Sequence, residues 1–126
     1  MKKILIIDDS LMDRKLLSSL LKKFGLENEV LQAGDGEEGF RVLGENASDI
    51  GLIFLDWQMP KISGLDFMRA FVKVPTFSTI PIIMITASGT DENKSEAYGV
   101  NPKLAGYLVK PFRPDKLIEL TKSLLQ

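Results

Sequence analysis

Five polar residues stand where four short apolar runs of the chain end. These residues are Asp8 and Asp9, Asp56, Thr86 and Lys110. The three carboxylates are hard oxygen ligands of the kind that Mg²⁺ takes in proteins, with Mn²⁺ as the alternative ion. An aspartate carboxylate is also a nucleophile that can accept a phosphoryl group. The hydroxyl and the ammonium group suit the remaining oxygens of such a group, so the set predicts metal-assisted phosphoryl chemistry.

None of these residues is diagnostic by itself. Alone, Asp8 and Asp9 would more often form a strand end or a helix cap, and Lys110 would be a solvated surface lysine. Three carboxylates in one place repel, since two unit charges 4 Å apart interact by about 4 kcal/mol at an effective dielectric of 20. Lys110 supplies one positive charge, and a divalent cation is the economical source of the rest. Asp8, Asp9 and Asp56 are therefore the predicted metal ligands.

The segments between the apolar runs predict alternating strands and helices. Strands are expected at residues 4–7, 30–33, 50–55, 80–85 and 107–109. Helices are expected from a cap at Ser10 to a stop at Gly25, and at residues 36–44, 65–74, 91–98 and 114–125. Strands that are apolar throughout favour an α/β fold in which helices cover both faces of a doubly wound parallel sheet. Such sheets bind ligands at the carboxyl ends of their strands, where the five polar residues would meet.

The bulk composition narrows the function further. A chain of 126 residues is expected to form one domain over residues 1–126. Its formal net charge of −1 gives no general attraction for nucleic acid, so direct binding to nucleic acid is not expected. The sequence has no cysteine and no histidine, which excludes thiolate sites and any phosphohistidine on this chain. The first apolar run is too short for a signal peptide or membrane span, so we expect a cytoplasmic protein without membrane insertion.

With these motifs in place, the sequence resembles the receiver family of bacterial two-component response regulators, and especially its stand-alone chemotaxis branch. The similarity covers nearly the whole chain. It is carried by Asp8-Asp9, by Asp56-Trp57-Gln58-Met59-Pro60 with Gly64, by Thr86-Ala87, by Gly106-Tyr107 and by Lys110-Pro111-Phe112. The resemblance implies a flavodoxin-like sheet of five parallel strands in the order 2-1-3-4-5 with five flanking helices.

The resemblance also assigns roles to residues. It makes Asp56 the phosphoacceptor and Asp9 the more direct metal ligand of the acid pair. The backbone carbonyl of Gln58 would complete the metal ligands, and the phosphoryl group would contact Thr86, the backbone of Ala87, and Lys110. Thr86 and Tyr107 would form the switch that remodels the surface of the fourth helix, fifth strand and fifth helix. A cis peptide bond before Pro111 is also implied.

The same resemblance indicates the partners. A histidine kinase or a histidine phosphotransfer protein would donate the phosphoryl group, and an unidentified protein target would read the switched surface. The chain would catalyse its own phosphorylation and autodephosphorylation without turning over outside substrates. A receiver with no DNA-binding output is the expected form.

Three features depart from the family pattern or have a local explanation. Gln58 and Ser88 lie where side chains influence the access of water to an acyl phosphate, so the lifetime of phosphorylation is left open. The segment 98–106 is longer than usual and contains Pro102. Ser10 and Asp13 have the spacing of a capping box at the first helix, which places Asp13 outside the site.

Three other functions remain as alternatives. An aspartyl-nucleophile phosphohydrolase would need a second acid two residues after Asp56, where Gln58 cannot exchange protons. A flavodoxin-like cofactor binder would not place two acids in the loop after the first strand, where a cofactor phosphate would sit. A receiver-like constitutive binding module would not need the complete set of acids, hydroxyl and lysine.

Overall fold

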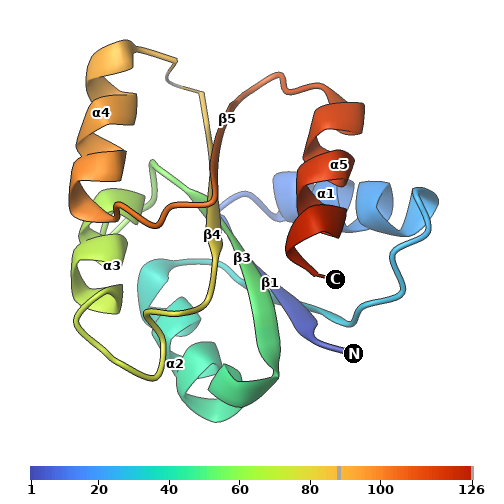
Figure 1. The fold of residues 1–126 in the computed structure, drawn as a ribbon, viewed down its shortest axis with the longest axis horizontal. Coiled ribbons are helices and arrows are strands. Elements are labelled where there is room, and N and C mark those ends of the chain that lie inside the picture. The colour runs from blue at the N-terminus through green and yellow to red at the C-terminus, as the bar shows by residue number, and fades with distance from the viewer. Residues whose placement is uncertain (88, 126) are drawn as a thin grey trace.

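The computed structural model describes residues 1–87 and 89–125, which form a parallel five-stranded sheet in the order β2-β1-β3-β4-β5 (Figure 1). This confirms the predicted fold class and strand order. The strands are β1 (Lys3–Ile7), β2 (Val30–Ala33), β3 (Ile50–Asp56), β4 (Ile82–Thr86) and β5 (Gly106–Val109). In the described ranges the α-helices are α1 (Leu11–Lys23), α2 (Gly36–Asn46), α3 (Gly64–Phe71), α4 (Asp91–Val100) and α5 (Pro114–Leu124), with one 3₁₀ turn at Ala47–Asp49.

Helices cover the sheet on both sides, with α1 and α5 on one face and α2, α3 and α4 on the other (Figure 1). Alternate residues of β1 divide between the two cores, because successive side chains of a strand point to opposite faces. Ile4 and Ile6 pack into the cluster with α1 and α5, whereas Leu5 and Ile7 pack into the cluster with α2 and α3. All four side chains are at most 2% exposed, as a strand covered on both faces requires.

Local chemistry explains where the elements begin and end. Gly25 follows α1 with φ of 89°, the left-handed conformation predicted for its stop. β4 begins at Ile82 and not at residue 80, since Pro81 has no N–H to give to a ladder. α3 ends at Phe71 and not at residue 74, where Pro75 disfavours helical backbone in the residue before it. The cis bond between Lys110 and Pro111 is confirmed.

The long segment before β5 is partly helical. α4 continues to Val100, two residues beyond the predicted end. Buried Asn101 then turns the chain, since its side-chain oxygen accepts a hydrogen bond from the N–H of Lys103 at 3.2 Å and its carbonyl accepts one from Leu104 at 2.9 Å. The residues before β5 thus form the end of α4 and one turn.

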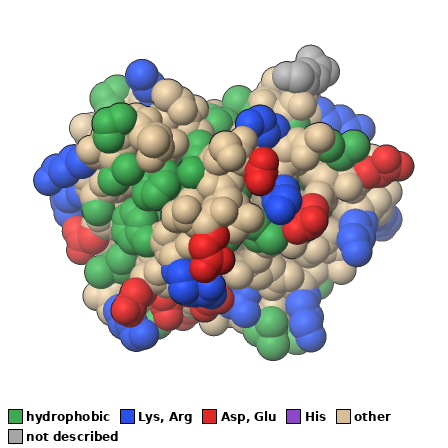
Figure 2. All heavy atoms as spheres, turned by 90° about the horizontal axis from the view of Figure 1, so that it is seen from below, with side chains coloured by type: hydrophobic (Ala, Val, Ile, Leu, Met, Phe, Trp, Pro, Cys, Tyr) green, Lys and Arg blue, Asp and Glu red, His purple; other side chains and the backbone are tan. Residues whose placement is uncertain are grey.

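The surface is mixed in character. Figure 2 shows basic and acidic side chains interspersed on one face, with hydrophobic side chains gathered to one side of it. The exposed large hydrophobic side chains include Leu11, Met12 and Leu16 of α1. None of the helices formed by residues 1–87 and 89–125 combines the length and the hydropathy that crossing a membrane requires.

Gly64 is the glycine on which the loop after β3 depends. Its N–H donates to the carbonyl of Trp57 at 2.7 Å, and a Cβ atom here would lie 2.2 Å from the backbone oxygen of Asp56. Because backbone must shift to relieve that overlap, Gly64→Ala is expected to lower the free energy of unfolding by about 1–3 kcal/mol. Urea unfolding measures the change.

The control is Gly44→Ala in α2, where the added methyl group meets open space. That change is expected to raise the free energy of unfolding by about 0.5–1 kcal/mol, because alanine is the better helix residue. Equal stabilities for the two variants would contradict the close approach at Gly64.

Candidate functional site

The ends of adjacent strands bring the predicted site residues together. Ile7 pairs with Leu55 across β1 and β3, which sets Asp8 beside Asp56. Asp56 in turn pairs with Ile85 of β4, and Thr86 pairs with Val109 of β5. Each polar residue therefore lies at the same edge of the sheet, one step from the next.

Asp8, Asp9 and Asp56 form the acidic group of the site. Each offers one carboxylate oxygen, and these atoms lie within 4.8 Å of one another. Asp8 is buried, Asp56 is half-buried and Asp9 is exposed. The donors fit a hard divalent cation, which binds one or two carboxylates and keeps its other positions for water and phosphoryl oxygens.

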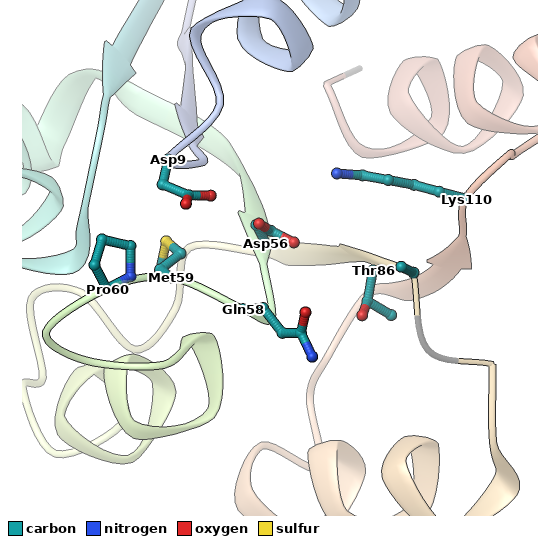
Figure 3. Close-up of a pocket in the computed structure, with 8 residues that line it drawn as sticks. Asp9, Asp56, Gln58, Met59, Pro60, Thr86 and Lys110 are labelled. Carbon is teal, nitrogen blue, oxygen red and sulfur yellow. The ribbon is translucent and has the colours of Figure 1, made fainter.

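A cavity of about 490 Å³ opens over this group (Figure 3). It is lined by Asp9, Asp56, Gln58, Met59, Pro60, Thr86, Ala87 and Lys110. In Figure 3, Asp56 lies in the middle, with Asp9 on one side of it and Thr86 and Lys110 on the other. The cavity therefore holds the predicted acceptor, one acid of the pair and the phosphoryl-contact residues. Ser88 lies outside the described residues.

Asp8 is fixed by three contacts. Its backbone N–H donates to the carbonyl of Ala33 at 3.1 Å, and its carbonyl accepts from Arg14 Nη1 at 2.6 Å. Its Oδ1 accepts from the N–H of Ser10 at 2.9 Å. The buried carboxylate is thus oriented by the loop that leads into α1, and it presents its second oxygen to the site.

The predicted capping box at α1 forms only in part. Ser10 Oγ accepts a hydrogen bond from the N–H of Asp13 at 3.1 Å, as expected. The reciprocal hydrogen bond of a capping box, from the N–H of Ser10 to the carboxylate of Asp13, does not form, because that N–H donates to Asp8 Oδ1. The carboxylate of Asp13 is therefore available, and its Oδ2 lies 3.0 Å from Lys110 Nζ. Asp13 thus contacts the predicted site residue Lys110, although Asp13 itself does not line the cavity over Asp56.

Lys110 reaches two acids at the edge of the site. Its Nζ lies 3.0 Å from Asp13 Oδ2 and 3.4 Å from Asp8 Oδ2. Burial by itself would lower the pKa of Lys110, but the hydrogen bond with Asp13 and the charges of Asp8 and Asp56 outweigh it and raise the pKa. The side chain is therefore a fixed positive charge at neutral pH.

The environment of Asp56 disfavours the ionised form of its carboxyl group. Burial, followed by repulsion from Asp8, raises the pKa of Asp56 from 3.8 to about 6, although the charge of Lys110 acts in the opposite direction. Functional sites often contain a carboxyl group whose pKa is raised by burial and by neighbouring acids. A cation among the three carboxylates would remove the repulsion.

Tyr107, the predicted switch residue, lies beside the residue that follows Asp56. Its half-buried ring packs edge-on against Trp57, with ring centroids 6.5 Å apart and planes at 79°. Burial raises the pKa of Tyr107. The tyrosine on β5 thus contacts the loop after β3, which gives a path by which a change at Asp56 could reach the fifth strand.

Comparison with known proteins agrees with this geometry. Residues 4–122 match the sequence model of the response regulator receiver domain. The chain is 39% identical over 119 residues to chemotaxis protein CheY1 of Helicobacter pylori, a match that covers 93% of this chain and 91% of that protein. It is 33% identical over 125 residues to the chemotaxis protein CheY homolog of Campylobacter jejuni, covering 98% and 92%.

A solved structure is similar as well. The chain aligns with the chemotaxis response regulator CheY4 of Vibrio cholerae with a TM-score of 0.84 and 31% identity. The alignment covers 98% of both chains. The sheet order and the helices on its two faces are therefore those of a solved chemotaxis protein.

Proposed function

The chain belongs to the response regulator receiver domain family, and on this basis we propose that Asp56 accepts a phosphoryl group from a phosphohistidine on another protein. The observation that carries the proposal is the group of three carboxylates whose oxygens lie within 4.8 Å of one another, two of which, those of Asp9 and Asp56, line the cavity. Asp56 is the member of that group that lies at the end of the central strand. The proposal takes residues 1–126 as one receiver unit.

The transfer requires a nucleophile and a place for charge. An oxygen of Asp56 forms a bond to phosphorus while the bond from phosphorus to the donor imidazole nitrogen breaks, and the imidazole keeps that electron pair and later takes a proton from water. Asp8, Asp9 and the backbone carbonyl of Gln58 would hold Mg²⁺ beside Asp56, with Mn²⁺ as the alternative. When bound, this ion supplies positive charge for the phosphoryl oxygens. Thr86, the backbone of Ala87, and Lys110 would contact those oxygens from the opposite side.

The donor and the target lie outside this chain. The sequence has no histidine, so a phosphohistidine donor has to be another protein, which we propose is a histidine kinase or a histidine phosphotransfer protein. Phosphorylation would draw Thr86 toward Asp56 and turn Tyr107, and a target protein would read the surface of α4, β5 and α5. Because such donors are charged from ATP inside cells, a cytoplasmic location is part of the proposal.

Hydrolysis of outside substrates is the second candidate, and Gln58 weighs against it. The residue two positions after the nucleophile lines the cavity, where a hydrolase would need an acid and base. We therefore assign to the chain only its own phosphorylation and autodephosphorylation.

The proposal is tested by incubating the wild-type chain with acetyl phosphate and Mg²⁺. The intact mass is expected to increase by one phosphoryl group, and reduction of the acyl phosphate with borohydride followed by peptide mapping is expected to mark Asp56. A mark on another residue would reject Asp56 as acceptor. Sustained release of phosphate from a generic phosphate ester would favour the hydrolase.

A further inference from the structure

Lys110 lies between two cavities. One is the cavity over Asp56, and the other, of about 310 Å³, lies between α1 and α5 and is lined in part by Leu16 and Phe112. Lys110 lines both, whereas Asp13 lines only the second. In Figure 3 the side chain of Lys110 extends from the end of β5 toward the acidic residues. Its ammonium group can therefore be held on the α1 side or on the acceptor side.

The contacts of Lys110 favour the α1 side. Its shortest ion pair, at 3.0 Å, is with Asp13, and the longer one, at 3.4 Å, is with Asp8. Within residues 1–87 and 89–125, no ion pair joins Lys110 to Asp56. Asp8 also belongs to the group of carboxylates around Asp56, and Asp13 does not. Asp8 can therefore keep the ammonium group as it moves toward Asp56, but Asp13 has to release it.

We infer that Asp13 is a positioning residue, which holds Lys110 at α1 in the unphosphorylated protein and competes with a phosphoryl group on Asp56 for the same ammonium group. This inference rests on the proposed function. Occupation of Asp56 by a phosphoryl group draws Lys110 away from Asp13, so the ion pair at α1 opposes phosphorylation. By linkage, a phosphoryl group on Asp56 weakens the contact between β5 and α1.

The exposure of the two side chains sets the expected effect of removing the ion pair between Asp13 and Lys110. The side chains of Lys110 and Asp13 are 28% and 42% exposed, so water screens the pair and its contribution is modest. Its removal is expected to tighten the binding of a phosphoryl analogue by about threefold. Asp13→Asn is the suitable change, because the amide keeps the shape of the side chain and removes its charge.

Asp66→Asn is a matched control. Asp66 takes the same place in the first turn of α3 that Asp13 takes in α1, and its N–H donates to Ser63 Oγ at 3.1 Å, as that of Asp13 does to Ser10 Oγ. Its carboxylate pairs with the exposed Arg69. The control loses the same favourable charge at a helix N-terminus without touching Lys110.

The probe is beryllium trifluoride with Mg²⁺, which mimics a phosphoryl group on a carboxylate. Trp57 is the one tryptophan in the sequence and follows Asp56 directly, so its fluorescence reports binding. Titrations are made on the wild type, Asp13→Asn, Asp66→Asn, Lys110→Ala, and the double variant Asp13→Asn with Lys110→Ala. Urea unfolding checks that each variant is folded.

The expected result is about threefold tighter binding for Asp13→Asn, no change for Asp66→Asn, and no effect of Asp13→Asn when Lys110 is alanine. A purely structural or long-range electrostatic role of Asp13 would persist without Lys110, and that result would overturn the inference. Unchanged or weaker binding for Asp13→Asn would also overturn it. Failure of the wild type to bind the probe would instead reject the proposed function on which the inference rests.

Discussion

The variant Asp56→Asn is expected to gain no phosphoryl group under conditions that label the wild-type chain once. The amide has no charged oxygen to attack phosphorus, while the other acids, Thr86 and Lys110 remain in place. Neither Asp8 nor Asp9 lies at the end of the central strand, so neither is expected to replace Asp56. Intact mass after incubation with acetyl phosphate and Mg²⁺ measures the result. Labelling that survives the substitution would move the acceptor to another residue.

The same variant is expected to be more stable than the wild type at pH 7 without divalent cations. The pKa of Asp56 is raised from 3.8 to about 6 by burial and by the charge of Asp8. The folded protein therefore binds more protons than the unfolded chain between these pH values, and stability falls as the pH rises through this window. Asp56→Asn removes that loss. It is expected to raise the free energy of unfolding at pH 7 by about 1 kcal/mol, once the partial exposure of Asp56 is allowed for.

Two further measurements check that Asp56→Asn raises the stability at pH 7. The free energies of unfolding of the two proteins, measured in urea, are expected to converge as the pH falls below about 4, where Asp56 is protonated in both states. Mg²⁺ is expected to reduce the difference at pH 7 by offsetting the repulsion in the wild type. A variant that is less stable than the wild type at pH 7 would show that Asp56 makes a stabilising contact that outweighs its burial and its repulsion from Asp8.

Most of the sheet could be predicted because its signals are local and repeated. Strands covered on both faces are apolar throughout, and the residue after each such run had to lie at the carboxyl edge. Parallel strands in a single sheet then bring Asp8, Asp56, Thr86 and Lys110 together, whatever the detailed packing. The ends of elements were predicted less well. The extension of α4 to Val100 depends on Asn101, whose backbone and side-chain hydrogen bonds become visible only when the turn is formed.

The contact between Asp13 and Lys110 could not be predicted, because the two residues are 97 positions apart and Asp13 had a sufficient local explanation. The N–H of Ser10 donates to the carboxylate of the buried Asp8, and the carboxylate of Asp13 is therefore free to pair with a distant partner. One signal was present in the sequence. If α1 follows the first strand directly, its first turn must lie at the same edge of the sheet as Lys110, so any acid in that turn is a candidate partner.

Removal of Mg²⁺ by a chelator is expected to slow the labelling of Asp56 by about 100-fold or more, and Asp9→Asn should have an effect of similar size. A bound cation supplies several kcal/mol of charge stabilisation to a transferred phosphoryl group. Asp9 is the exposed acid that lines the cavity with Asp56, so its loss would remove a direct ligand of the proposed cation. The rate of mass increase with acetyl phosphate, followed with and without the chelator, measures both effects.

Lys110→Ala gives the comparison that separates the cation from the lysine. Lys110 carries a single charge that is shared with Asp13 and Asp8, so its loss is expected to slow labelling far less than the loss of Asp9. The exposed pair of Glu37 and Lys61 lies outside the cavity, and Glu37→Gln should leave the rate unchanged. Equal losses for Lys110→Ala and Asp9→Asn would mean that the lysine contributes as much as the cation to charge neutralisation.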